Sequence, residues 1–265
     1  MTTDNHLVSL DGVGVATVTL NRPDLRNAFD DRLIADLTAT FARLGADAAV
    51  RAVVLRGAGK AFSAGGDLNW MRRMAGYGEA ENLADAKLLA KLMRTLDELP
   101  KPTVAAVHGA CYAGGMGLVA CADIAIAADD AVFSLSEVRL GLVPAVISPY
   151  VTRAIGPRAM RRYALTAEQI GAAEALRIGF VHEVVPVAGL DEAVGRIVSA
   201  LAAGGVAAQA KTKDLLAAIA FRPIDDTVTD RTAKAIAAAR AGEEAREGLA
   251  AFFEKRKPAW QQRKA

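Results

Sequence analysis

Two glycine-rich loops and one glutamate are the residues of this chain best suited to chemistry. The loops read Ala61-Phe-Ser-Ala-Gly-Gly-Asp-Leu68 and Gly109-Ala-Cys-Tyr-Ala-Gly-Gly-Met-Gly-Leu118, and each follows a strand-like apolar run. Glycine leaves backbone N–H groups unshielded, so two such loops brought together would aim paired donors at one oxyanion. Glu137 follows in a largely apolar stretch. A lone carboxylate near an oxyanion site predicts proton transfer beside a carbonyl group.

Several other chemistries are disfavoured by the absence of their motifs. The sequence contains no HExxH or CxxC pattern, and Cys111 and Cys121 lack metal-ligand spacing, so we expect no metal site. Neither glycine loop carries the Lys-Ser/Thr of a phosphate-binding loop or opens a helix with G-x-G-x-x-G. Nucleotide hydrolysis and dinucleotide redox chemistry are therefore disfavoured. His108 and His182 sit at strand positions and are interpreted as structural histidines.

The composition predicts one main domain with an appendage. The chain has 265 residues, of which 52% are hydrophobic, so a large core is available. Its 32 basic and 30 acidic residues nearly balance, which argues against nucleic acid or an anionic membrane as the main partner. Two cysteines fit a reducing compartment. The start Met1-Thr-Thr-Asp-Asn-His6 has neither the basic residues nor the apolar core typical of a signal peptide. We therefore expect a cytoplasmic protein.

The segment from Pro102 to Ala122 carries no charged residue and has the length of a membrane helix. Glycines crowd its middle and His108 interrupts it, so a buried strand, a glycine turn and a buried helix explain it better.

The hydrophobic periodicities predict strand–helix units followed by an all-helical tail. The expected strands are 7–10, 15–20, 52–55, 103–107, 124–127, 132–134 and 182–185, the first two forming a hairpin. From residue 148 onward the pattern is mostly helical. The other expected helices are 30–44, a short one capped by Asp67, 81–99, one that the second glycine loop opens and that runs through 118–121, 137–140, and in the tail 206–220, 225–241 and 243–255.

In combination, these motifs resemble the crotonase, or enoyl-CoA hydratase/isomerase, superfamily. The likeness runs from Leu20-Asn-Arg-Pro23 through both glycine loops to Phe252-Phe-Glu-Lys-Arg-Lys257. It implies an α/β fold with a spiral core of ββα turns over residues 1–203 and a C-terminal helical trimerisation region over 204–265. It also implies a homotrimer or a dimer of trimers, and an acyl-CoA substrate that brings coenzyme A with it, with no further cofactor.

The resemblance assigns roles to particular residues. It implies that the N–H groups of Gly66 and Gly114 form an oxyanion hole and that Glu137 exchanges protons with the substrate. The residues expected to contact coenzyme A, partly through backbone atoms, are Leu25, Arg26, Ala64, Asp67 and Leu68, with Phe252 and Lys255 reaching in from a neighbouring subunit.

The residues by themselves leave plainer interpretations open. Gly66 and Gly114 could be ordinary glycines of tight turns, where a positive φ is required, and Glu137 suits the start of a short helix. Asp67 suits a helix N-cap as well as a ligand contact, and both roles can coexist.

One position departs from the family pattern. The best-studied hydratases use a second glutamate, and its position here is Gly117. A single carboxylate suffices to move a proton between C2 and C4, which is isomerisation. Hydration through Glu137 alone needs another group to order the water. A glutaconyl-type substrate carries a distal carboxylate, which Arg72 or Arg73 would hold.

Four further segments narrow the resemblance to bacterial methylglutaconyl-CoA and isohexenylglutaconyl-CoA hydratases. The leading prediction is therefore a lyase that hydrates a branched, glutaconyl-type 2-enoyl-CoA. The alternatives are a Δ3,Δ2-enoyl-CoA isomerase and a non-catalytic acyl-CoA-binding member. The four segments are Asp67-Leu-Asn-Trp-Met71, Asn82-Leu-Ala-Asp85, Gly117-Leu-Val-Ala-Cys-Ala-Asp-Ile-Ala-Ile-Ala127 and Leu142-Val-Pro-Ala-Val-Ile-Ser-Pro-Tyr150.

Overall fold

A computed structural model describes residues 5–262 and contains two mixed β-sheets. In the larger sheet the strand order is β1-β2-β3-β5-β7-β10, with β1 antiparallel at one edge. In the smaller sheet the order is β4-β6-β8-β9, with β9 antiparallel. The strands are β1 His6–Leu10, β2 Val15–Leu20, β3 Ala52–Gly57, β4 Ala61–Ser63, β5 Thr103–Val107, β6 Ala110–Tyr112, β7 Ile124–Ala128, β8 Val132–Ser134, β9 Ile170–Gly171 and β10 Glu183–Val185.

The chain alternates between the two sheets as it advances. β3, β5 and β7 belong to the larger sheet, and each is followed directly by a short strand of the smaller one: β4, β6 and β8. A helix follows each pair: α2 (Leu68–Met74), α4 (Gly114–Cys121) and the 3-10 helix η2 (Glu137–Leu140). Because β4, β6 and β8 are parallel neighbours, their carboxyl ends share one edge of the smaller sheet. Three segments distant in sequence therefore meet there.

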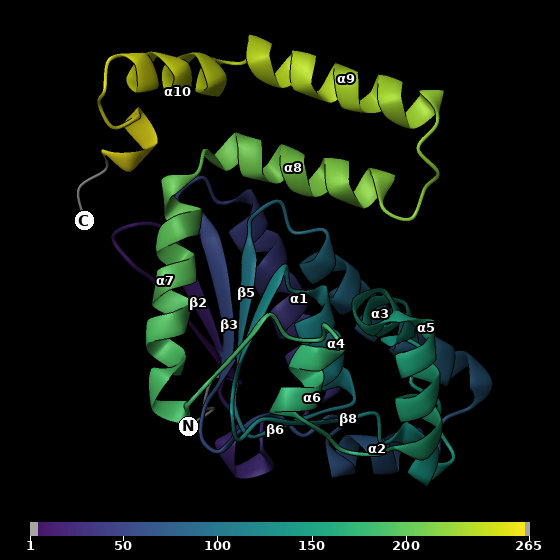
Figure 1. The fold of residues 1–265 in the computed structure, drawn as a ribbon. Coiled ribbons are helices and arrows are strands. Elements are labelled where there is room, and N and C mark those ends of the chain that lie inside the picture. The colour runs from purple at the N-terminus through teal and green to yellow at the C-terminus, as the bar shows by residue number, and fades with distance from the viewer. Residues whose placement is uncertain (1–4, 263–265) are drawn as a thin grey trace.

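Helices cover both faces of the larger sheet. On one face lies α7 (Leu190–Ala203), which packs Leu190, Ala193 and Val194 against buried strand residues such as Ile126. On the other, α1 (Asp31–Ala46) buries six residues at helical spacing, and α3 (Glu79–Asp97), α4 and α5 (Ser148–Thr166) join it around the main core. Figure 1 shows this division, with α7 on one side of the strands and α1, α3, α4 and α5 on the other.

The C-terminal helices α8 (Val206–Ile219), α9 (Asp226–Ala241) and α10 (Glu243–Phe253) form a layer beyond the end of the sheets (Figure 1). Among the residues that the structure describes, neither α8 nor α9 contributes a buried side chain. Two cations connect this layer or the segments that flank it to the rest of the fold. Arg51 donates to the carbonyls of Ala202 and Gly204, which precede α8, and of Trp260, which follows α10. Lys213 on α8 pairs with Asp123 at 2.6 Å. The remaining elements are η1 Pro23–Leu25, α6 Ala172–Arg177, η3 Val187–Gly189 and η4 Ala259–Gln261.

The α/β class, the hairpin and the helical tail are confirmed, while the glycine loops contain more structure than predicted. The sequence predicts only turns around residues 61–66 and 109–114, yet β4 and β6 form there. The helix predicted to open from the second loop is α4, which begins at Gly114. The short strand β9 was also not predicted. The division at residues 203/204 stays a prediction, and residues 1–4 and 263–265, on which the signal-peptide expectation and the end of the tail partly rest, lie outside the described residues.

Within residues 5–262, no single helix is long and apolar enough to cross a membrane. Residues 187–203 and 206–219 meet the length and hydropathy criteria only as a pair, and that pair bends by 102°. The segment 102–122 forms the predicted strand and helix, β5 and α4, with the unpredicted strand β6 between them.

Candidate active site

The first glycine loop holds the Gly66 peptide from both sides. The Phe29 N–H donates to the Gly65 carbonyl at 2.7 Å, and the Asp67 N–H donates to the Phe29 carbonyl at 2.7 Å, so Gly66 and Phe29 face each other as an isolated β-bridge. Among the described residues, the Gly66 N–H itself has no hydrogen-bond acceptor. The loop therefore presents a fixed and unused donor.

The second loop presents a donor in the same way. Ala113 adopts a left-handed φ of 47° and donates its N–H to the Ser134 carbonyl at 2.9 Å, and α4 begins at the next residue. The Gly114 N–H, at the positive end of the α4 dipole, finds no acceptor within the described part of the chain. A Cβ added to Gly65 would lie 3.0 Å from the Ala113 Cβ, so the two loops are in van der Waals contact.

Glu137 follows β8 and begins η2. Its side chain is half-buried, and its Oε2 atom is fully buried with no hydrogen-bond partner among residues 5–262. Burial raises the pKa of this carboxyl above its ordinary value, and a hydrogen bond from its own backbone N–H opposes that shift more weakly. A carboxylate with one unpartnered oxygen and a raised pKa is suited to accept and return a proton.

Gly117 is not an empty position. A Cβ added there would lie 2.4 Å from Ile147 Cγ2 and 3.0 Å from Met93 Sδ, and both side chains are buried. The space beside α4 in which a second carboxylate would begin is therefore filled by apolar atoms. Restoring that carboxylate requires more than replacing the glycine.

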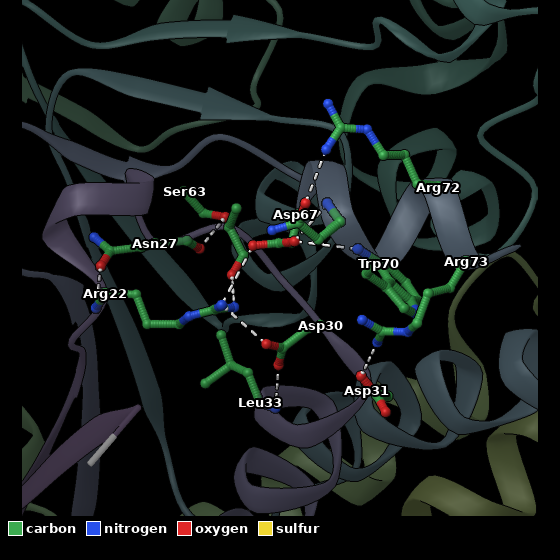
Figure 2. Close-up of polar contacts among 12 residues, drawn as sticks. Arg22, Asn27, Asp30, Asp31, Leu33, Ser63, Asp67, Trp70, Arg72 and Arg73 are labelled. Carbon is green, nitrogen blue, oxygen red and sulfur yellow. Dashed lines mark hydrogen bonds and ion pairs between the residues drawn. The ribbon is translucent and has the colours of Figure 1, made fainter. Parts of the chain in front are cut away.

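A buried polar network positions the first loop (Figure 2). The Asn27 side chain, which is fully buried, donates to the Ala58 and Ala61 carbonyls at 2.9 and 2.8 Å, and the Ser63 hydroxyl donates to the Asn27 carbonyl at 2.9 Å. The same hydroxyl accepts the Gly65 N–H at 3.3 Å. These bonds tie the segment after β2 to the residues just before Gly66.

Asp67 is used by the protein itself. Its carboxylate caps α2 by accepting the N–H groups of Asn69 and Trp70, and it pairs with Arg22 at 3.3 Å, where Arg22 also pairs with Asp30 at 2.9 Å (Figure 2). The side chain is 8% exposed. The N-cap role is confirmed, and the ligand contact stays a prediction.

The other residues predicted to contact coenzyme A are placed in two groups. Arg26 and Ala64 are adjacent, since the Ala64 N–H donates to the Arg26 carbonyl at 2.9 Å, and Leu25 and Leu68 beside them are exposed. Phe252 and Lys255 lie far along the chain, at the end of α10 and just after it, with Phe252 75% exposed. Their contact with a neighbouring subunit stays a prediction.

Arg72 and Arg73, the two candidate cations for a distal acid, differ in what they bind. Arg73 pairs with Asp31 at 2.6 Å, whereas Arg72 donates to the neutral side-chain oxygen of Asn69 at 3.0 Å (Figure 2). Asp31 therefore neutralises the charge of Arg73, whereas no carboxylate among the described residues pairs with Arg72.

The histidines after β5 and before β10 and the two cysteines lie in structural positions. His182 Nδ1 accepts the Ala125 N–H at 3.0 Å, and His108 Nε2 bonds with the Gly59 carbonyl at 2.9 Å. Cys111 and Cys121 are buried, and burial raises the pKa of both thiols. Residues 5–262 contain no cluster of three or more His, Cys, Asp or Glu side chains able to hold a metal ion.

Sequence reasoning missed three side chains near the site: Phe29, Met93 and Ile147. Each is an ordinary apolar residue of a core pattern, and its place depends on contacts distant in sequence. The Phe29 ring lies close to the Gly114 backbone, and no local sequence pattern around either residue indicates this contact.

Known proteins resemble this chain over nearly its whole length. The family model "Enoyl-CoA hydratase/isomerase" matches residues 11–263. A putative enoyl-CoA hydratase of Thermus thermophilus is 36% identical, over 95% of this chain and 99% of the relative. The structure of an enoyl-CoA hydratase from Shewanella pealeana superposes with a TM-score of 0.94 at 45% identity, covering 98% of this chain and 97% of the other. Pseudomonas aeruginosa AtuE superposes with a TM-score of 0.93 at 38% identity, covering 98% and 100%.

Proposed function

The chain belongs to the enoyl-CoA hydratase/isomerase, or crotonase, family, and from that membership we propose that it adds water across the C2=C3 bond of a 2-enoyl-CoA. Family membership makes it an enzyme that acts on acyl-CoA thioesters and gives it the α/β crotonase fold. What we propose beyond this membership is the reaction, hydration, and the identity of the acyl group.

The two free N–H groups support an oxyanion hole. The thioester carbonyl oxygen would accept hydrogen bonds from Gly66 and Gly114, and charge that develops on it as an enolate would strengthen both bonds. Removing one such donor from an acyl-transfer enzyme costs about 2.7–4 kcal/mol of barrier. Because α4 starts at Gly114, its dipole adds to the stabilisation.

The observation that carries the proposal is the unpartnered, buried Oε2 of Glu137. In hydration this carboxylate takes a proton from water while the oxygen of that water bonds to C3 and the C2=C3 electron pair moves into the enolate. Glu137 then returns the proton to C2, and the carbonyl re-forms. One carboxylate thus serves both proton transfers.

The experiment is turnover of 3-methylglutaconyl-CoA and crotonyl-CoA in H₂¹⁸O, followed by mass spectrometry. We expect ¹⁸O in a 3-hydroxyacyl product, with the label lost in Glu137→Gln. Label that persists in Glu137→Gln would refute the role of the carboxylate, and wild-type protein that binds these thioesters but converts neither would favour the non-catalytic alternative.

A second candidate, Δ3,Δ2-enoyl-CoA isomerisation, is favoured by the filled space at Gly117. Moving a proton between C2 and C4 requires no ordered water. Hydrogen exchange at C2 and C4 from D₂O without net water addition, tested with a 3-enoyl-CoA, would select this reaction over hydration.

For the acyl group, we propose a branched glutaconyl type, of the kind used by methylglutaconyl-CoA and isohexenylglutaconyl-CoA hydratases. Arg72 supports this, since its charge faces only a neutral partner among the described residues and is available to a substrate carboxylate. That carboxylate would in turn help order the water that Glu137 activates. Crotonyl-CoA, which lacks the distal acid, is the comparison substrate, and its hydration at an equal rate would refute this assignment.

For the assembly, we propose a homotrimer or a dimer of trimers built through the C-terminal helices. Large apolar side chains there are open to solvent in the single chain: Phe221 is 85%, Ile224 92% and Phe253 75% exposed. Sedimentation equilibrium of the purified protein tests this, and a monomer would refute it.

A further inference from the structure

Phe29 contacts both glycine loops, one through its backbone and the other through its ring. We infer that Phe29 is a positioning residue that fixes the spacing between the Gly66 and Gly114 N–H donors. The inference rests on the proposed role of these two groups as an oxyanion hole.

The backbone of Phe29 fixes the Gly66 peptide. Its N–H and C=O each make a 2.7 Å hydrogen bond, to Gly65 and Asp67, the two residues that flank Gly66. The Gly66 peptide cannot rotate without stretching one of these bonds. The direction of the Gly66 N–H is therefore set relative to the Phe29 backbone.

The ring of Phe29 fixes Gly114. A Cβ added to Gly114 would lie 2.7 Å from Phe29 Cε2 and 2.8 Å from Cδ2, well inside the ordinary carbon–carbon contact distance of about 3.5–4.0 Å. The ring edge therefore faces the Gly114 backbone directly, at a distance that only glycine permits. Since Phe29 is 1% exposed, the ring has no solvent-filled space into which to withdraw.

Residues on both sides of Phe29 are themselves anchored. Arg22 donates to the Ala28 carbonyl at 2.6 Å and pairs with Asp30 at 2.9 Å, and Asp30 caps α1 by accepting the Leu33 N–H (Figure 2). The Phe29 backbone is thus clamped while its ring acts as a spacer. A shift of either loop changes the distance between the two donors.

Substitution of Phe29 by Leu removes the ring edge and keeps an apolar side chain. A matched control is Phe41→Leu on α1, since Phe41 is also fully buried in the same core cluster. Both variants lose apolar contacts and are expected to lose similar stability. A purely structural role predicts the same kinetics for both.

We expect Phe29→Leu to lower kcat for hydration at least tenfold with KM within about twofold, because donor spacing acts on the enolate more than on substrate binding. Phe41→Leu is expected to keep kcat within about twofold of wild type. Equal kcat values in the two variants would overturn the inference. If Phe29→Leu does not fold, Phe29→Met, which conserves more volume, replaces it and is judged by the same comparison.

A second readout separates this inference from the proposed function. Acetoacetyl-CoA forms an enolate that absorbs in the ultraviolet, and an oxyanion hole would increase that absorbance on binding. Wild-type protein with neither turnover nor enolate signal would refute the proposed function itself. Wild-type protein with both signals, together with a Phe29→Leu enolate signal as strong as that of Phe41→Leu, would refute only the positioning role.

Discussion

Replacing Gly117 tests whether the missing second carboxylate is an empty position or a filled one. Gly117 lies in the first turn of α4, and its α-hydrogens face Ile147 and Met93. We predict that Gly117→Ala destabilises the protein and that Gly117→Glu does not create a second acid/base group. The reason is packing rather than chemistry.

The magnitude follows from the distances around Gly117. An added Cβ lies 2.4 Å from Ile147 Cγ2, so this methyl group must retreat by roughly 1 Å to reach ordinary contact distance. Ile147 is buried and β-branched, and its χ1 angle has little freedom. Overpacking of this kind costs about 1–3 kcal/mol. The better helix propensity of alanine returns about 1 kcal/mol.

The assay is thermal unfolding followed by circular dichroism, with Gly195→Ala as the matched control. Gly195 lies within α7, and a Cβ there meets no atom within 4 Å, so this variant gains helix propensity without a clash. We expect Gly117→Ala to unfold below wild type and Gly195→Ala at or above it, the difference amounting to about 1–3 kcal/mol. Ile147→Ala should destabilise the Gly117→Ala variant less than it destabilises wild type, because it removes the methyl group that the added Cβ meets.

Equal melting temperatures for Gly117→Ala and Gly195→Ala would refute the packing argument. For Gly117→Glu, burying a carboxylate among apolar side chains adds a desolvation cost. A folded Gly117→Glu protein that hydrates crotonyl-CoA faster than wild type would refute the functional half of the prediction.

Four further predictions concern titratable and charged groups. Because burial raises the pKa of Glu137, the acidic limb of kcat/KM should lie above the ordinary glutamate value of about 4.3, as a pH–rate profile measures. The raised pKa also means that the fold disfavours the ionised form of Glu137, so the stability contributed by this group falls as pH rises from the ordinary pKa to the raised one. Glu137→Gln should therefore melt at or above the temperature of wild type at pH 7. A lower melting temperature contradicts this. Arg72→Met should raise KM for 3-methylglutaconyl-CoA about tenfold, which is about 1.4 kcal/mol of binding, and leave KM for crotonyl-CoA unchanged. The control, Arg73→Met, should change KM for neither substrate, because Arg73 already pairs with Asp31. Cys111 and Cys121 should react with a thiol reagent such as DTNB only after unfolding, since both are buried and burial raises their pKa; rapid native labelling contradicts this.

The sequence predicts the features that local patterns encode. The apolar periodicity of α1 and the strand-like runs of β3, β5 and β7 identify the frame of the fold, and Asp67 followed by the α2 pattern identifies a helix start. Glycine pairs in an otherwise apolar chain identify the two loops. Glu137 is conspicuous because charge is rare around it.

What the sequence does not reveal depends on long-range packing. Strands β4 and β6 have three residues each and lie inside glycine-rich segments, so no alternation is long enough to detect. They form because each pairs with neighbours that arrive much later or earlier in the chain. The filling of the Gly117 space by Ile147 has the same origin, since the contact joins α4 to the start of α5.

The order of strands in the smaller sheet constrains how a thioester can lie in the proposed site. β6 lies between β4 and β8, so Gly114, which follows β6, sits between the Gly66 donor after β4 and the Glu137 carboxylate after β8. If both N–H groups bind the carbonyl oxygen as proposed, that oxygen would lie between the segments after β4 and β6, and the acyl carbons would extend toward the segment after β8. The exposed residues Leu25 and Leu68, which are predicted to contact coenzyme A, lie beside the first loop. We therefore propose that the strand order of the smaller sheet sets the direction of the substrate, with C2 on the side of Glu137.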